Sequence, residues 1–391
     1  MRPFTHFSLA GLTALTMGSA TFVQPSFGIL ATAFIGEFRI DRWQVGLLVT
    51  AMSWTGALVA PLFGRLTDRV GSVRSVRGVL TGGMVSIAVV ASSPGFAVLF
   101  LGALLSGIPN GWTNPATNAL IVDNIPAGAR GVITGIKQSG VQMGAFLGGV
   151  LLPIVSAAYN WRVALASFLV FPAAGLVGML RRPSVEREAR PDGEQRGRVP
   201  TSVRWIAVYG AITGLGTSAT LTFLPLFAEE SQGWRTAHAG LLIAGVGFVG
   251  VIARITWGSA SERWLGHGRT LRLLALQSGV AAVLLALASA GASPSWVLVP
   301  VALLFGAGAV AWNAVGMIAV MDYSSPDLVG RGTGLAMLGY LSGSGLGAPL
   351  MGLSVDRLGE YTPGWTVLAT LFALSAIVAG RIHRTGNLAH V

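Results

Sequence analysis

Two cationic side chains, Lys137 and Arg254, lie well inside apolar stretches that are long enough to cross a membrane. All 15 acidic residues fall in loops or within about one turn of a predicted helix end. A cation at membrane depth costs at least ~2.5–3.5 kcal/mol on insertion scales, so each of these side chains needs a partner. We expect an anionic solute, because the fork of N–H groups on an arginine matches the two oxygens of a carboxylate.

A structural role for the two cations is the alternative. Either side chain can extend to the membrane interface or bond carbonyl groups at the ends of the predicted fourth and tenth helices. We expect substrate binding at Arg254, whereas both interpretations stay open for Lys137, the one lysine of the sequence.

Further polar and aromatic side chains of the predicted helices are candidate substrate contacts. They are Gln24, Trp112, Asn114, Gln138, Trp312 and Asn313. Polar side chains in membrane spans often only cross-link helices, which is the simpler interpretation for most of them. Trp112 and Trp312 occupy matching helices and are expected to line the transport path. Four other tryptophans lie at predicted outer interfaces, where indole rings anchor spans: Trp43, Trp161, Trp234 and Trp365.

The residues that enzymes use are missing from the predicted helices. The sequence has no cysteine and five scattered histidines, so we expect no metal site and no cofactor. No nucleophile–base pair lies inside the helices, so no catalytic residue is assigned. A membrane enzyme and a non-transporting sensor are therefore both disfavoured.

The composition requires a membrane. Of 391 residues, 52% are hydrophobic and 10% charged, and the mean hydropathy is +0.67. A soluble protein of this length could not cover so much apolar surface. A span needs ~20 mostly apolar residues, so we predict an all-α integral membrane protein with twelve transmembrane helices. They lie near 8–33, 43–64, 75–93, 95–122, 131–156, 160–180, 204–228, 237–259, 270–291, 295–321, 330–355 and 361–381.

The predicted helices form two similar halves. Segment 181–203 is polar, contains three prolines and has no apolar periodicity, so it is expected to be a cytoplasmic linker between six-helix bundles at 1–180 and 204–391. Gly46-Leu47-Leu48 recurs as Gly240-Leu241-Leu242, and Arg130-Gly131 recurs as Arg331-Gly332. Such a parallel repeat is typical of transporters that alternate access around a central site.

The positive charge is distributed unevenly between the loops. The net charge is +11, and 19 of the 25 arginines fall on one predicted side of the membrane. This asymmetry indicates cytoplasmic termini, in a bacterial inner membrane, with the lipid bilayer rather than nucleic acid as the partner. We expect a monomer.

Glycines recur along two equivalent helices, which is a further mark of the repeat. They are spaced mostly by four or five residues from Gly131 to Gly149 in the fifth helix, and recur from Gly332 to Gly347 in the eleventh. Small residues at this spacing let helix backbones approach closely. Tight packing explains any single glycine, but the two matching stripes favour a moving interface.

The loop Gly64-Arg65-Leu66-Thr67-Asp68-Arg69-Val70-Gly71 resembles the signature of the major facilitator superfamily, and a degenerate copy runs from Gly258 to Gly266. The resemblance covers the whole chain and implies a fold of two pseudo-symmetric bundles. It also implies that helices 5 and 8 are neighbours across the halves, so that Lys137 and Arg254 are expected to face one cavity.

Narrower resemblances point to more than one subfamily. The segment Gly250–Gly258, with Arg254 before its Trp-Gly end, is similar to oxalate:formate antiporters and monocarboxylate transporters, in which the matching arginine binds the substrate carboxylate. The predicted eleventh helix lacks an interior lysine, unlike the antiporters. The stretch Gly131–Gly140 looks more like cyanate transporter relatives.

The signature loops are also expected to gate the cytoplasmic side. By resemblance, Asp68 pairs with Arg130 or Arg69 and breaks that contact on opening. The expected gating set is Asp68, Arg69, Arg130, Glu262, Arg263 and Arg331. A static topology anchor is the alternative.

Two transport functions follow from these patterns. The first is secondary active transport of a small organic anion, such as a monocarboxylate, by rocker-switch alternating access. The second is efflux of a drug or metabolite, because the segment Gly140–Gly149 resembles the antiporter motif of the superfamily, with Ala145 in place of its proline.

Overall fold

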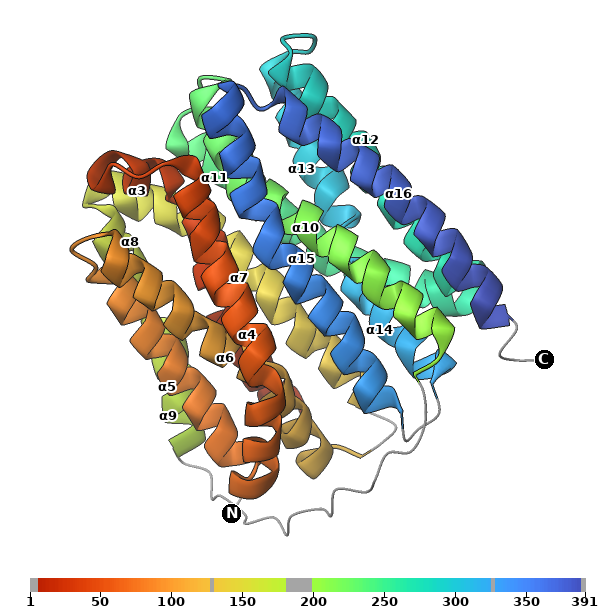
Figure 1. Cartoon of the computed structure of the whole chain (residues 1–391). Helices are drawn as coiled ribbons and strands as arrows, with labels where there is room; N and C mark the ends of the chain where they lie inside the picture. Colours follow the sequence, from red (N-terminus) through yellow and green to blue (C-terminus); the bar gives the residue numbers. More distant parts are fainter. Residues whose placement is uncertain (1–5, 127–129, 181–198, 325–327, 388–391) are drawn as a thin grey trace. The chain divides into compact units, whose positions relative to one another are not determined.

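The computed structural model describes residues 6–126, 130–180, 199–324 and 328–387, without the side chains of residues 6–7, 130–132 and 383–387. The described chain is helical and divides into two compact units (Figure 1). Unit 1 comprises residues 1–40 and 51–191, and unit 2 comprises residues 41–50 and 192–391. The division falls within the predicted linker. Residues 41–50 group with unit 2, whereas the sequence placed them in the first bundle.

Unit 1 contains the six spans predicted for the first half. Its helices are α1 (His6–Thr21), α2 (Val23–Ile29), α3 (Ala31–Phe38), α4 (Arg42–Val70), α5 (Ser72–Ala91), α6 (Phe96–Asn124), α7 (Arg130–Ala158), α8 (Trp161–Ser167) and α9 (Val170–Leu180). The first span is interrupted at Phe22 and Leu30, and the sixth between α8 and α9. The first turns of α4 belong to unit 2, although α4 is one continuous helix.

Unit 2 contains the remaining six spans. Its helices are α10 (Thr201–Glu230), α11 (Thr236–Ala260), the π-helical turn η2 (Ser261–Leu265), α12 (His267–Ser289), the short turn η3 (Ser295–Val297), α13 (Leu298–Ala307), α14 (Trp312–Tyr323), α15 (Val329–Leu358) and α16 (Thr362–Asn387). The predicted tenth helix is therefore broken between α13 and α14.

Ten helical segments of the described chain are long and apolar enough to cross a membrane. The first span is not among them, because its interruptions leave pieces of 16, 7 and 8 residues. The 30-residue α15 is not among them either, since its many glycines and serines add little hydropathy. The architecture is that of a twelve-span integral membrane protein.

The glycine stripes lie inside the units. A Cβ on Gly339, Gly343 or Gly347 of α15 would collide with carbonyl oxygens of α10, and one on Gly140 of α7 would collide with the Ala14 carbonyl of α1. Glycine is required where backbones approach this closely. These stripes therefore serve tight packing within each unit, which corrects the expectation of a moving interface.

Matching backbone geometry supports the internal repeat. Gly71 (φ 84°, ψ 159°) precedes α5 and Gly266 (φ 73°, ψ 152°) precedes α12, each in a positive-φ conformation that glycine adopts without strain. The next residue then bonds an acid at the end of a later helix. Ser72 donates to Asp123 at 2.7 Å, and His267 lies 2.7 Å from Asp322.

Candidate functional site

The break in the tenth span is the irregular feature nearest to Arg254. The helix stops at Ala307, Gly308 takes the unusual dihedral angles φ −98° and ψ −99°, and regular α-helix resumes at Trp312. A Cβ on Gly308 would lie 2.5 Å from the Ser278 hydroxyl of α12 and 3.0 Å from the Leu304 carbonyl oxygen, so the tight packing of this turn favours glycine. Within a membrane, irregular backbone persists only where protein or a water-filled cavity satisfies it.

Three side chains of unit 2 satisfy carbonyl groups around this break. Gln277 donates to Leu304 O at 3.0 Å, and the Trp257 indole donates to Ala307 O at 3.0 Å. Arg254 donates to Val310 O through Nε at 3.4 Å and Nη2 at 3.3 Å. Arg254 thus contacts the tenth span, as the structural alternative proposed. The roles of Trp257 and Gln277 could not be identified from the sequence, because residues 308–311 contain no proline that would mark the helix break which these side chains contact.

Three aromatic side chains pack together near the helix break. Tyr340 of α15 lies near Arg254. The Tyr340 ring lies 5.3 Å from the Trp312 ring between centroids, and the Tyr209 ring lies 6.1 Å from the Trp312 ring. Trp312 is 2% exposed, so it forms the wall behind Tyr340 rather than an open surface. The arrangement combines one cation with an aromatic wall at a helix break.

Lys137 in unit 1 is fully buried and bonded to neutral groups. Its Nζ donates to Asn118 Oδ1 at 2.6 Å and to Asn114 Oδ1 at 3.1 Å, and Gln138 donates to the same Asn114 oxygen at 3.2 Å. These contacts join α6 to α7. They bring three of the predicted site residues together, in a cross-link that satisfies the ammonium group. Lys137 and Arg254 lie in different units, so a shared cavity stays a prediction.

The remaining predicted contacts are Trp112, Gln24 and Asn313. Trp112 packs on Phe63 at 4.6 Å between ring centroids, donates to the Thr67 hydroxyl at 2.9 Å and covers Gly78. It therefore belongs to the packing of unit 1. Gln24 in α2 and Asn313 in α14 are both half-buried.

The predicted gating residues are mostly exposed. Asp68, Arg69, Glu262, Arg263 and Arg331 are exposed at helix ends, and the side chain of Arg130 lies outside the described residues. Among the described side chains, Asp68 and Arg69 form no ion pair. The gate expected at these residues stays a prediction.

A charged cluster at the start of α4 was not identified from the sequence. Arg42 bonds Glu230 through Nε–Oε2 at 3.0 Å and Nη2–Oε1 at 2.9 Å, and it bonds Asp356 through Nη1–Oδ1 at 3.3 Å. Asp356 also accepts the backbone N–H of Trp43 at 2.9 Å, which satisfies a free donor at the helix N-terminus. Tyr361 donates to Glu230 at 2.6 Å, and burial raises the pKa of its hydroxyl so that it remains a donor. We call these residues the Arg42 cluster.

Unit 1 carries a similar cluster with a local arginine. Glu37 accepts the Trp161 indole N–H at 2.5 Å and pairs with Arg162 at 2.6 Å. Hydrogen bonds from Arg162, opposed by partial burial, lower the pKa of Glu37. In unit 1, Trp161 is followed by Arg162, which pairs with Glu37. In unit 2, Tyr361 is followed by Thr362, and the cation that pairs with Glu230 is Arg42 instead.

Two of the predicted interface tryptophans are buried. Trp161 is 5% exposed and Trp365 is fully buried, packing on Phe227 at 5.8 Å between ring centroids. The prediction that both anchor the protein at the membrane interface was wrong, because their neighbours in the folded units cover them.

Comparisons with known proteins agree on the family. The Major Facilitator Superfamily profile matches residues 9–348 and residues 206–385. The chain is 28% identical over 355 residues to the class G tetracycline resistance protein of Vibrio anguillarum, covering 86% of each. It is 28% identical over 392 residues to monocarboxylate transporter 13 of Rattus norvegicus, covering 94% of this chain and 87% of that protein. Its fold matches a bacterial homologue of the human lysosomal transporter Spinster in an inward-facing, occupied conformation, with a TM-score of 0.73 at 16% identity over 97% of this chain and 96% of that one.

Proposed function

Because the chain belongs to the major facilitator superfamily, we propose that this transporter moves a small organic anion, such as a monocarboxylate, by secondary active transport. The observation that carries the proposal is the position of Arg254 at the break between α13 and α14. A superfamily assignment alone does not name the substrate, since related folds carry different solutes. The site must supply that argument.

The guanidinium of Arg254 can exchange its carbonyl partner for a carboxylate. A hydrogen bond to an ionised acceptor is roughly twice as strong as one to a neutral carbonyl, and a carboxylate takes two parallel N–H groups from an arginine. The Val310 oxygen, at 3.3–3.4 Å, is a long contact that an anion can replace. Tyr340, supported by the buried Trp312 ring, then offers an aromatic face to the remainder of a small acid.

This exchange would couple binding to the shape of the tenth span. Once the carboxylate takes the guanidinium, the Val310 carbonyl loses its donor and the segment at Gly308 is free to adopt another conformation. Gln277 and Trp257 continue to hold the carbonyls before the break. The proposed orientation puts both termini in the cytoplasm of a bacterial inner membrane, following the arginine distribution of the sequence.

Thermal stabilisation by a panel of small carboxylates tests the proposal. A ligand that binds only the folded state raises the apparent free energy of unfolding by RT ln(1 + [L]/Kd). This amounts to about 2.7 kcal/mol at a ligand concentration of 100 times Kd. We expect a carboxylate to stabilise the wild type and to lose this effect in Arg254→Ala.

Gln277→Leu is the matched control. It removes another donor to the same break while leaving the charge of the site unchanged. If Gln277→Leu loses the anion response as completely as Arg254→Ala does, the two residues serve only the helix break. If no carboxylate stabilises the wild type, the anion proposal fails and efflux of a neutral drug or metabolite takes precedence.

A further inference from the structure

Lys137 is a buried titratable group that the proposed anion site does not use. Its Nζ donates to Asn118 Oδ1 at 2.6 Å and to Asn114 Oδ1 at 3.1 Å, and both acceptors are neutral amides. We call these three residues the Lys137 cage. A neutral amine keeps two N–H groups, which is the number of acceptors that the cage provides. Both hydrogen bonds can therefore persist when the side chain loses or gains a proton.

No carboxylate fixes the charge of the cage. Lys137 is in none of the ion pairs of the described side chains. The helices packed against α7 are α1, α2, α6 and α8. Their described titratable side chains are engaged elsewhere, since Asp123 of α6 accepts from Ser72 and Arg162 of α8 pairs with Glu37. An opposite charge beside Nζ would hold lysine in its ammonium form, and the cage contains none.

The amide of Asn118 provides a path from Lys137 to water. Lys137 is fully buried, but Asn118, which bonds its Nζ, is exposed. Both residues lie about 9–11 Å from a helix end, at 1.5 Å per residue. An exposed amide at this depth faces water rather than lipid, because lipid would leave its N–H groups without acceptors. Rotation of this one side chain would uncover the amine.

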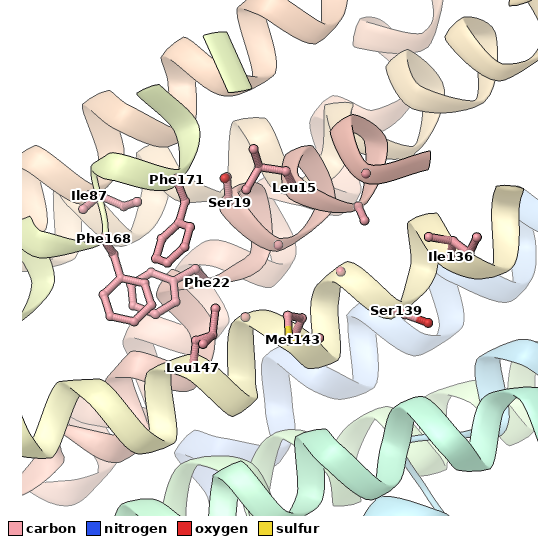
Figure 2. Close-up of a pocket in the computed structure, with 15 residues that line it drawn as sticks. Leu15, Ser19, Phe22, Ile87, Ile136, Ser139, Met143, Leu147, Phe168 and Phe171 are labelled. Carbon is pink, nitrogen blue, oxygen red and sulfur yellow. The ribbon is translucent and has the colours of Figure 1, made fainter. Parts of the chain in front are cut away.

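Another face of α7 offers no such path. An apolar cavity of about 360 Å³ lies between α1, α7 and the segment that joins α8 to α9 (Figure 2). Its described lining includes Ile136 and Ser139, which flank Lys137 along α7, but not Lys137 itself. A hydrated proton would lose its hydration in this apolar lining without gaining a partner. The proton of Lys137 therefore exchanges on the side of Asn118.

We propose that Lys137 is the proton carrier of a proton-coupled transport cycle. When Asn118 turns away, one N–H bond of the ammonium breaks, its electron pair stays on Nζ, and a water molecule takes the proton as hydronium. The reverse step reloads the amine when the transporter opens to the opposite side of the membrane. One proton moving with one carboxylate leaves the cycle electrically neutral. The proposal rests on the proposed function only for the identity of the anion that moves with the proton.

The charge of Lys137 can be observed directly, because it is the one lysine of the sequence. Growth on lysine labelled with carbon-13 at Cε gives the full chain a single lysine resonance, whose chemical shift differs between amine and ammonium. In detergent micelles we expect this NMR resonance to move between the two positions as the pH is varied from about 5 to 9, whereas a lysine in water, with a pKa of ~10.4, stays charged over this range.

Asn118→Asp is the matched control for the cage. It places a carboxylate where the amide oxygen bonds Nζ at 2.6 Å, so the resonance should stay at the ammonium position over the same range. A wild-type resonance that stays at one position throughout would overturn the proposal. So would an Asn118→Asp variant that titrates as the wild type does.

Transport into proteoliposomes tests the coupling, with radiolabelled lactate as the probe and protein-free liposomes as the blank. If one proton accompanies each anion, a gradient of about one pH unit should accumulate lactate about tenfold, because the two ratios are equal in free energy. Lys137→Gln should lower this ratio to about 1 while lactate exchange without a pH gradient continues, since an amide carries no proton. Ser139→Ala, two positions further along α7, is the control and should accumulate lactate as the wild type does.

The results separate this proposal from the anion site. Lactate exchange without pH-driven accumulation in the wild type would overturn proton coupling and leave the anion site intact. Loss of exchange in a folded Lys137→Gln variant would assign Lys137 to anion binding and would also overturn the proposal. If no carboxylate is transported, or if Lys137→Gln does not fold, the NMR titration of the wild type and of Asn118→Asp decides the proton site alone.

Discussion

Removing the guanidinium of the Arg42 cluster should release the start of α4 from unit 2. Residues 41–50 group with unit 2 whereas the rest of α4 groups with unit 1, so this segment must detach or bend if the units move. Arg42 holds it by a two-point contact with Glu230 and a third contact with Asp356. The side chains are 33%, 24% and 15% exposed, so solvent screens these contacts only in part.

The size of the effect follows from that exposure. A partly exposed ion pair contributes about 0.2–1 kcal/mol, and Arg42 joins two carboxylates, one of them by parallel bonds. We therefore expect Arg42→Ala to cost about 1–2 kcal/mol, which raises the detached population roughly 5- to 30-fold. The Asp356 bond to the Trp43 backbone survives the substitution, so detachment stays partial.

Thiol labelling measures this population directly, because the natural chain has no cysteine. Val45 is fully buried, so a cysteine introduced there with Val45→Cys should react slowly with a charged maleimide. Adding Arg42→Ala should raise the labelling rate 5- to 30-fold, in proportion to the detached population. Arg162→Ala, which breaks the equivalent ion pair of unit 1, is the control and should leave the rate unchanged. An unchanged rate in Arg42→Ala, or an equal rise in the control, would refute the reasoning.

Three further predictions concern stability. Gly343→Ala should lower the free energy of unfolding, measured in a detergent titration, by about 1–3 kcal/mol, because the added Cβ would collide with the α10 backbone. Gly334→Ala on the same helix meets no atom within 4 Å and should be neutral or stabilising, so equal losses in both would contradict the packing argument. Trp257→Phe should lower the free energy of unfolding in the same titration by about 1–3 kcal/mol, because it leaves the Ala307 carbonyl without the indole donor. Stabilisation of the protein by an added carboxylate should persist in this variant. The lowered pKa of Glu37 stabilises the fold above its ordinary value of 4.5, and this contribution is lost as pH falls through the lowered value. The difference in melting temperature between wild type and Glu37→Gln should therefore disappear at acidic pH, and a difference that persisted there would argue against the ion pair.

Much of the fold could be predicted from the sequence because membrane insertion is a local property. The spans follow from stretches of ~20 apolar residues, and the two halves follow from short repeated segments such as those around Gly46 and Gly240. The depth of Lys137 and Arg254 also follows, since depth depends only on distance along a helix. The family assignment rested on the same local signals.

The partners of those charges depended on tertiary structure. Arg254 contacts Val310 at the point where the tenth span breaks at Gly308, and Ser278 of another helix packs closely against this glycine. Lys137 is bonded by Asn114 and Asn118, 23 and 19 residues away. The partners of Arg42, Glu230 and Asp356, are 188 and 314 residues away. A hydrogen bond depends on separations of about 3 Å in space, whereas the sequence records only order along the chain, so the spans could be located from the sequence but their polar contacts could not.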